Sequence, residues 1–259
     1  MRLLGLHWFG SKNKHLPFVL PLLPRAGIYA EPFGGSAAVL LNRPRSGTEV
    51  YNDLNEGLAA FLRTLRDDTD RLLELIDLTP HSRSEYSTMR KSQYLEMDPV
   101  ERARIFYCLS KFGLSGQHSF GRRIGGNGSG PRHTHTGMRI AARRLRGVTI
   151  ENRDALDVIR EYDSDDTLFY LDPPHTLGSR LRSGFLYEHE YDDDSHEELA
   201  DLVRGARGRV AVSGYDSPLY EKLYRGWRTA SSAPRKIAID NVYTPSEHKT
   251  AVEKVWMNY

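Results

Sequence analysis

The sequence predicts an α/β fold in which a Rossmann-like, doubly wound sheet carries an inserted, mainly helical lobe. Short apolar runs that end at glycine, proline or acidic residues alternate with helix-like segments at both ends of the chain. This order is typical of a parallel sheet flanked by helices. Residues 67–146 break the alternation, and 259 residues can form a core domain with a second lobe. We therefore expect a core domain from residues 1–66 and 147–259, with residues 67–146 inserted between them.

The first elements follow from short apolar runs and their end points. Residues 28–30 predict a strand, and the segment 31–36 (EPFGGS) predicts a tight turn that leads into a helix over residues 37–41. Residues 49–51 predict a second strand, which ends at Asn52 and Asp53. A helix is expected after it, because apolar residues recur at helical spacing from Leu58 to Leu65.

The alternation returns in the last part of the chain. Strands are predicted over residues 148–150, 168–171 and 210–212, with a helix whose apolar face spans residues 199–206. Three closing strands, expected to pair antiparallel, are predicted over residues 227–230, 237–239 and 251–256. Residues 121–137 contain six glycines and almost no apolar side chain, which predicts a loop at the end of the inserted lobe.

The distribution of charge is far more uneven than the net charge of +2 suggests. Residues 102–150 hold ten basic residues and no acid, whereas residues 151–201 hold 16 acids and four arginines. A segment without acids repels itself and gains most when its charges meet phosphates. We therefore expect nucleic-acid contact there, with a merely solvated basic surface as the alternative.

The composition limits the compartment in which we expect the protein and the kinds of metal or disulfide site that it can form. Cys108 is the single cysteine, so the chain can build neither a disulfide framework nor a cysteine-based zinc site. His118, His133 and His135 lack acidic or cysteine neighbours, and we expect no metal. No stretch has the roughly 18 apolar residues of a membrane helix. We expect a cytoplasmic protein that needs neither a membrane nor an obligatory protein partner.

The segment Asp172-Pro173-Pro174-His175 ends a predicted apolar strand. A carboxylate oxygen and a backbone carbonyl can each accept one hydrogen of an exocyclic amine, which frees the nitrogen lone pair for attack. Proline fixes φ and so helps to hold its own carbonyl in place. The next ring can stack on a base that has been flipped out of a duplex. The alternative is an ordinary loop, because Asp and Pro favour turns.

Two further strand ends can contact a cofactor. Glu31 precedes a glycine turn, which lets a ligand approach the backbone closely. Asp53 lies 22 positions later, at the end of the next strand. That spacing suits a carboxylate that accepts hydrogen bonds from ribose hydroxyls. A helix N-cap is the alternative role of Asp53.

Together these motifs resemble the Dam-like DNA adenine-N6 methyltransferases of the D12 class, which include phage members. Residues 8–12 (WFGSK) are similar to the family's N-terminal W-x-G-x-K motif, residues 31–36 to its E-P-F-x-G-x loop and residues 172–174 to its catalytic D-P-P. The resemblance assigns a role to most of the residues singled out above. It implies S-adenosylmethionine contacts for Trp8, Lys12, Glu31, Phe33, Gly34, Asp53 and Asp154, and catalytic roles for Asp172, Pro173, Pro174 and His175. The absence of acids from the basic segment predicts the DNA contacts, for which we single out Arg122, Arg123 and Arg132.

The resemblance implies methyl transfer to adenine N6 in double-stranded DNA, by base flipping and direct in-line transfer, and a place in restriction-modification. The core domain would hold the cofactor and residues 67–146 would recognise the DNA target. His175 departs from the pattern, because the family has Tyr or Phe there. Two alternatives stay open: a catalytically silent DNA-binding homologue, or methylation of another exocyclic amine, in cytosine N4 or in RNA.

Overall fold

The structure, a computed structural model, divides the chain into two compact units. It describes residues 4, 6, 8, 10–113, 120, 121, 131–174, 191–237 and 249–259, without the side chains of residues 131–134, 236, 237 and 249–251. The first unit comprises residues 1–14, 35–44 and 53–152, and the second comprises residues 15–34, 45–52 and 153–259. These boundaries differ from the expected ones. That residues 67–146 form a separate DNA-recognition lobe remains a prediction.

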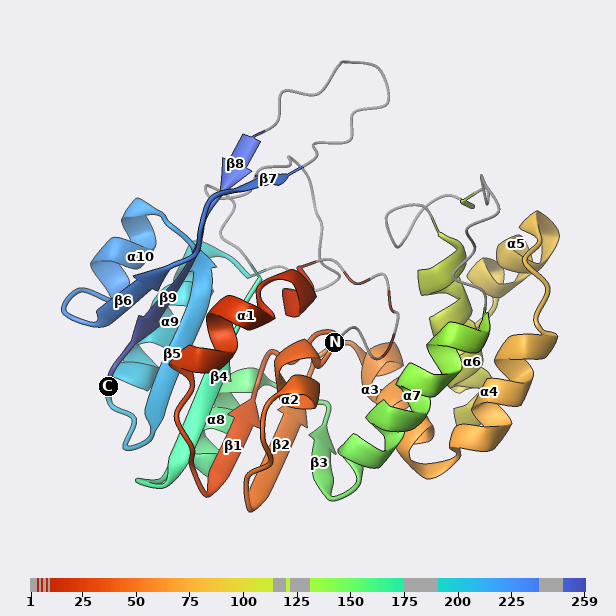
Figure 1. The fold of residues 1–259 in the computed structure, drawn as a ribbon, viewed down its shortest axis with the longest axis horizontal. Helices are drawn as coiled ribbons and strands as arrows, with labels where there is room; N and C mark the ends of the chain where they lie inside the picture. Colours follow the sequence, from red (N-terminus) through yellow and green to blue (C-terminus); the bar gives the residue numbers. More distant parts are fainter. Residues whose placement is uncertain are drawn as a thin grey trace. The chain divides into compact units, whose positions relative to one another are not determined.

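The second unit is built on a mostly parallel sheet (Figure 1). Its strands follow the order β2-β1-β4-β5-β9-β6. Strands β2, β1, β4 and β5 are parallel, and β9 is antiparallel to β5 and β6. The mixed α/β architecture confirms the predicted fold class. The bounds are β1 (Ile28–Glu31), β2 (Thr48–Asn52), β4 (Thr167–Leu171), β5 (Arg209–Tyr215), β6 (Arg228–Ser231) and β9 (Glu253–Met257), with a separate pair of strands, β7 (Arg235–Ile237) and β8 (Lys249–Ala251).

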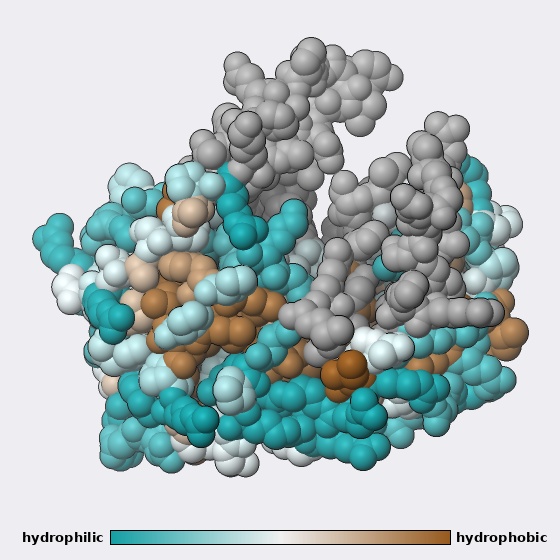
Figure 2. Space-filling model, viewed as in Figure 1, coloured by the Kyte–Doolittle hydropathy of each residue, from teal (hydrophilic) through white to brown (hydrophobic). Residues whose placement is uncertain are grey.

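Both faces of this sheet are covered, which explains why its strands are apolar almost throughout. Alternate side chains such as Val50, Phe169 and Val212 form a core with α8 (Ala155–Tyr162), α9 (Asp193–Arg204) and α10 (Pro218–Leu223). The short helices α1 (Leu16–Val19) and η2 (Leu20–Leu22) cross the other face (Figure 1). Apolar surface is visible over α1 in Figure 2.

The strand order places a switch point between β1 and β4. The chain passes from β1 to β2 on one side, and β4 pairs with β1 on the other. Parallel strands end at the same edge of a sheet, and ligands of doubly wound folds bind at that edge, near the switch point. Glu31, Asn52 and Asp172 stand at or directly after the carboxyl ends of β1, β2 and β4.

The first unit is mainly helical. Helix α3 packs against α6 and α7, and α6 also packs against α4 and α5. Asparagine or aspartate side chains begin two of these helices, because Asn55 accepts from Leu58 N and Asp98 accepts from Val100 N. The bounds are η1 (Lys12–Lys14), α2 (Ala38–Asn42), α3 (Glu56–Asp67), α4 (Thr69–Leu78), α5 (Arg83–Lys91), η3 (Tyr94–Glu96), α6 (Pro99–Phe112), α7 (Pro131–Leu145) and β3 (Val148–Glu151).

Several of the predicted boundaries are wrong. The closing strand expected over residues 251–256 is divided between β8 and β9. The strand expected over residues 237–239 begins earlier, at Arg235, and residues 238 and 239 lie outside the described residues. The loop expected over residues 121–137 ends earlier, because α7 begins at Pro131, a residue that suits the first turn of a helix. The strand expected over residues 210–212 runs on to Tyr215, because β9 pairs with β5 as far as Tyr215 and Glu253. None of the helices in the described part of the chain has the length and apolar character that crossing a membrane requires.

Candidate active site

The aspartate of the D-P-P motif lies directly after β4 and is held by a neighbouring strand. Leu171 of β4 is in register with Val212 of β5, so the next residues, Asp172 and Ser213, are also neighbours. The Ser213 hydroxyl donates a hydrogen bond of 2.9 Å to Asp172 Oδ1. Asp172 is partly buried, so this hydrogen-bonded carboxylate stays accessible at the edge of the sheet.

The two prolines of the motif continue this edge. Pro173 is buried and Pro174 is partly buried, whereas His175 lies outside the described residues. Proline has no N–H, so Pro173 contributes only its carbonyl to the polar groups near Asp172. A carboxylate and a carbonyl from adjacent residues are the pair of acceptors that the sequence predicts for an exocyclic amine.

Asn52, at the end of β2, ties the two loops on either side of it. Its side-chain amide donates to the Pro32 carbonyl at 2.8 Å and to the Arg153 carbonyl at 3.0 Å, and its Oδ1 accepts from Arg153 N at 3.0 Å. Its own backbone carbonyl accepts from Gly34 N at 2.8 Å. Asn52 is fully buried. From the sequence, Asn52 was predicted only to end a strand, although a polar residue at the end of an apolar strand can indicate a residue that binds neighbouring loops.

The glycine turn after β1 fits tightly against β2. A Cβ atom at Gly34 would come 2.2 Å from the Tyr51 ring, so this position excludes any larger residue. The Phe33 ring packs edge-on against Tyr191, with ring centroids 5.5 Å apart. The backbone of this turn is therefore held close to β2, and an aromatic pair packs beside it.

Two acids of the second unit have different local roles. Glu31 is almost fully buried, and the Tyr29 hydroxyl donates to its Oε1 at 2.5 Å. Asp154 is exposed and caps α8, because its carboxylate accepts from Leu156 N at 2.7 Å. Burial, and the nearby carboxylate of Asp154, raise the pKa of Tyr191 above its ordinary value. Tyr191 therefore stays a neutral phenol beside Asp154. The sequence analysis did not single out Tyr191.

In the first unit, Asp53 accepts hydrogen bonds from Gly35, the residue that follows Gly34 in the glycine turn, and from Asn55. Its carboxylate accepts from Gly35 N at 2.8 Å and from Asn55 N at 2.9 Å. Gly35 has a φ of 47°, in the left-handed region that favours glycine. The N-cap role considered for Asp53 is wrong, because Asn55 caps α3. That the Asp53 carboxylate also accepts from a ribose remains a prediction.

Trp8 and Lys12 also belong to the first unit. The Trp8 ring packs against Phe106 with centroids 5.9 Å apart, and its Nε1 lies 3.1 Å from where a Cβ of Gly35 would stand. Lys12 is 5% exposed, which is unusual for lysine. Both side chains therefore pack within the first unit and contribute to its structure.

The basic segment is partly neutralised by acids from outside it. Arg102 pairs with Glu56 at 3.0 Å, and Arg139 pairs with Asp70. These pairs reduce the charge that residues 102–150 present to a partner, which the count along the sequence did not show. Arg122, Arg123 and the side chain of Arg132 lie outside the described residues, so their DNA contacts remain predictions.

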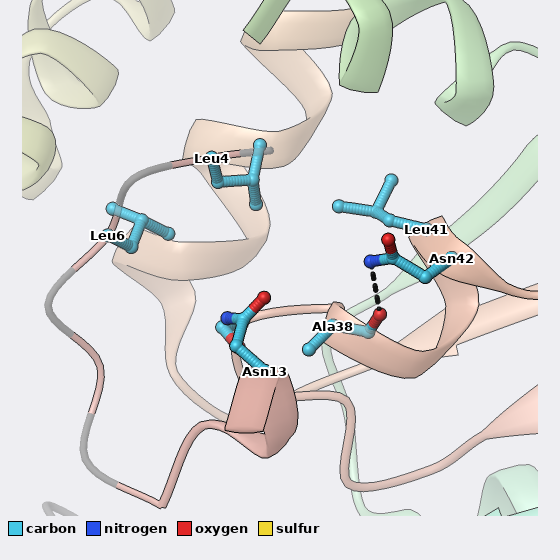
Figure 3. Close-up of a pocket in the computed structure, with 7 residues that line it drawn as sticks. Leu4, Leu6, Asn13, Ala38, Leu41 and Asn42 are labelled. Carbon is cyan, nitrogen blue, oxygen red and sulfur yellow. Dashed lines mark hydrogen bonds between the residues drawn. The ribbon is translucent and has the colours of Figure 1, made fainter. Parts of the chain in front are cut away.

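A small pocket in the first unit is not the cofactor site. Figure 3 shows apolar side chains of Leu4, Leu6 and Leu41 with Asn13 and Asn42 around it. Its volume of about 10 Å³ corresponds to roughly one water molecule. A nucleoside cannot enter it, and none of the predicted site residues lines it.

A carboxylate and two prolines after β4, and a glycine turn after β1, stand at the edge of a doubly wound sheet where ligands of such folds bind. The family model of the D12 class N6 adenine-specific DNA methyltransferases matches residues 8–238. The chain belongs to this family and is an adenine-specific DNA methyltransferase.

Individual relatives agree with the family. The chain is 27% identical over 252 residues to the type II methyltransferase M1.LlaDCHI of Lactococcus lactis subsp. cremoris, with 84% of this chain and 83% of the relative covered. It is 24% identical to the type II methyltransferase M.MjaIII of Methanocaldococcus jannaschii, covering 86% and 88%. It is also 24% identical to a DNA adenine methylase of Haemophilus influenzae, covering 85% and 82%.

Proposed function

We propose that this methyltransferase uses S-adenosylmethionine to methylate N6 of an adenine flipped out of double-stranded DNA, with Asp172 and the Pro173 carbonyl holding the target amine. The observation that carries the proposal is the fixed carboxylate of Asp172 at the carboxyl end of β4, next to the buried Pro173. S-adenosylmethionine supplies a methyl group on a sulfonium centre. The nitrogen lone pair attacks that methyl group, the carbon–sulfur bond breaks, and N6 gives up one proton.

The residues of this chain act on the amine and on the cofactor separately. Asp172 accepts one amino hydrogen and the Pro173 carbonyl accepts the other, which localises the lone pair on nitrogen. His175 flanks the flipped base. The cofactor is bound by the residues that the motifs single out for it, which are Trp8, Lys12, Glu31, Phe33, Gly34, Asp53 and Asp154. The nitrogen attacks the methyl group directly, so the proposed transfer needs no covalent enzyme intermediate.

The type II names of two relatives support a role for this chain in restriction-modification. Its place of action in this proposal is the cytoplasm. The decisive experiment incubates the protein with labelled S-adenosylmethionine and, in separate reactions, either DNA that lacks methylated adenine or RNA. Each nucleic acid is then digested to nucleosides and the labelled base is identified. Label in N6-methyladenine supports the proposal. Label in N4-methylcytosine or in RNA would replace the proposed substrate, and a folded protein that labels nothing would be a silent homologue.

Replacing Asp53 tests its part in cofactor binding. We expect Asp53→Ala to weaken S-adenosylmethionine binding about 10- to 100-fold, because ribose hydroxyls lose a charged acceptor worth ~1.5–3 kcal/mol. Isothermal titration calorimetry without DNA measures this. Asp53→Asn keeps an oxygen for Gly35 N and should lose less, since the turn stays in place. Unchanged affinity in a folded Asp53→Ala protein would remove Asp53 from the cofactor site.

The basic segment makes a prediction about salt. We expect DNA affinity to fall steeply with salt, and joint replacement of Arg122, Arg123 and Arg132 by Gln to flatten the slope of log affinity against log salt by roughly 0.9 per lost phosphate contact. Fluorescence anisotropy at several salt concentrations measures the slope.

The control for this experiment removes the same charge from arginines that already pair with acids. Arg71 pairs with Glu74, Arg139 with Asp70, and Arg160 with Asp157. Joint replacement of Arg71, Arg139 and Arg160 by Gln should leave the slope nearly unchanged. Equal slopes for the two triple variants would place the DNA contact outside Arg122, Arg123 and Arg132.

A further inference from the structure

A chain of three polar side chains crosses from β4 to β5 and ends at the predicted catalytic carboxylate. The Tyr170 hydroxyl lies 3.0 Å from Ser213 Oγ, and Ser213 Oγ lies 2.9 Å from Asp172 Oδ1. Tyr170 and Asp172 are two positions apart, so they project from the same side of β4. That side is opposite to Phe169 and Leu171, which belong to the apolar core.

The direction of the hydrogen bonds in this chain follows from the donors that are present. An ionised carboxylate only accepts, so Ser213 must donate its single hydrogen to Asp172. Ser213 Oγ is then left as an acceptor, and the Tyr170 hydroxyl donates to it. Tyr170 is 2% exposed and Ser213 is fully buried. Water is therefore kept from both hydroxyls, and connected buried hydrogen bonds strengthen one another.

We propose that Ser213 is a positioning residue for the methyl transfer, that it orients the Asp172 carboxylate, and that the Tyr170 hydroxyl in turn fixes Ser213. This inference rests on the proposed function of Asp172. The carboxylate can rotate about its side-chain bonds, and only some orientations aim an oxygen at an amine next to the Pro173 carbonyl. A bond from a fully buried strand residue to Oδ1 restricts that rotation and leaves further acceptor sites for the amine.

The test compares Ser213→Ala with Ser213→Thr. We expect Ser213→Ala to lower the single-turnover rate about tenfold or more, the size of effect expected when a charged group loses one hydrogen bond. The affinity for S-adenosylmethionine and the KM for DNA should stay within about twofold, because Ser213 is fully buried. Ser213→Thr keeps the hydroxyl and suits a strand, so it should restore most of the rate. A general loss of structure would change affinity as well as rate.

A second comparison tests the order of the chain. Tyr170→Phe keeps the ring and removes only the hydroxyl, so it should lower the rate by less than Ser213→Ala. If Tyr170 acts through Ser213, adding Tyr170→Phe to Ser213→Ala should cost nothing further, and the two effects will not add. Because Tyr170→Phe preserves the packing, it also tests the hydrogen-bonded chain of side chains if Ser213→Thr fails to fold. Additive effects of the two substitutions would contradict the proposal that Tyr170 acts through Ser213.

The control is Thr167→Val, which removes a buried hydroxyl at the opposite end of β4, where Thr167 Oγ1 donates to the Tyr162 carbonyl. It should leave the single-turnover rate within about twofold. A Ser213→Ala protein with the wild-type rate, alongside an inactive Asp172→Ala protein, overturns this inference alone. A wild type without N6-methyladenine product, or a fully active Asp172→Ala protein, overturns the proposed function and this inference with it.

Discussion

Asp172→Ala is expected to abolish methyl transfer, by ~10³-fold or more in single-turnover rate, while S-adenosylmethionine binding stays within about twofold. Removing a group that stabilises the reacting atoms costs on the order of 10²–10⁴ in rate. The loss falls on rate and not on cofactor affinity, because the carboxylate acts on the target amine. Quench-flow measurement with labelled cofactor, followed by nucleoside analysis, gives the rate, and calorimetry gives the affinity.

Two variants separate chemistry from structure in this experiment. Asp172→Asn keeps the shape and one acceptor oxygen but loses the charge, so its rate should lie between those of the wild type and Asp172→Ala. Asp165→Ala removes a carboxylate before the start of β4, where it pairs only with the exposed Arg207 among the described contacts. Exposed ion pairs of this kind contribute little to the free energy of unfolding, so Asp165→Ala should leave the methyl-transfer activity unchanged. If Asp172→Ala keeps wild-type activity, the amine is held by other groups.

The sequence predicted the fold well because the signals for it are local. Each apolar run that ends at an acid, glycine or proline became a strand, and the motifs at residues 31–36 and 172–174 follow β1 and β4 as expected. Parallel strands bring their carboxyl ends to one edge, so residue types at strand ends were sufficient to locate candidate site residues.

What the sequence missed depends on contacts between distant residues. Asn52 and Asp53 are adjacent and are equally plausible polar residues at a strand end. Only the structure shows that Asn52 is fully buried and ties two loops, while Asp53 holds the glycine turn. Charge along the chain was misleading for a similar reason, because Arg139 pairs with Asp70, 69 positions away. Neither relation has a signature within a short window of sequence.

Asn52→Asp is expected to destabilise the protein by about 3 kcal/mol or more at neutral pH, although it changes only an amide nitrogen to an oxygen. The amide donates to the carbonyls of Pro32 and Arg153, and a carboxylate would place a buried negative oxygen against both. Each buried group left without its partner costs ~1–3 kcal/mol, and a buried charge costs more. Urea denaturation measures the free energy of unfolding.

The pH dependence and a matched variant make this prediction specific. Burial and the two carbonyls would raise the pKa of the new carboxyl above its unfolded value, so the destabilisation should shrink as pH falls, when the neutral group can donate one hydrogen bond. Asn152 makes the same two donor contacts in the first unit, to the carbonyls of Asp53 and Leu54, but it is only partly buried. Asn152→Asp should therefore cost roughly 1 kcal/mol, because water can solvate its new charge. Equal losses in the free energy of unfolding for the two variants would show that the burial of Asn52 does not cause the larger effect.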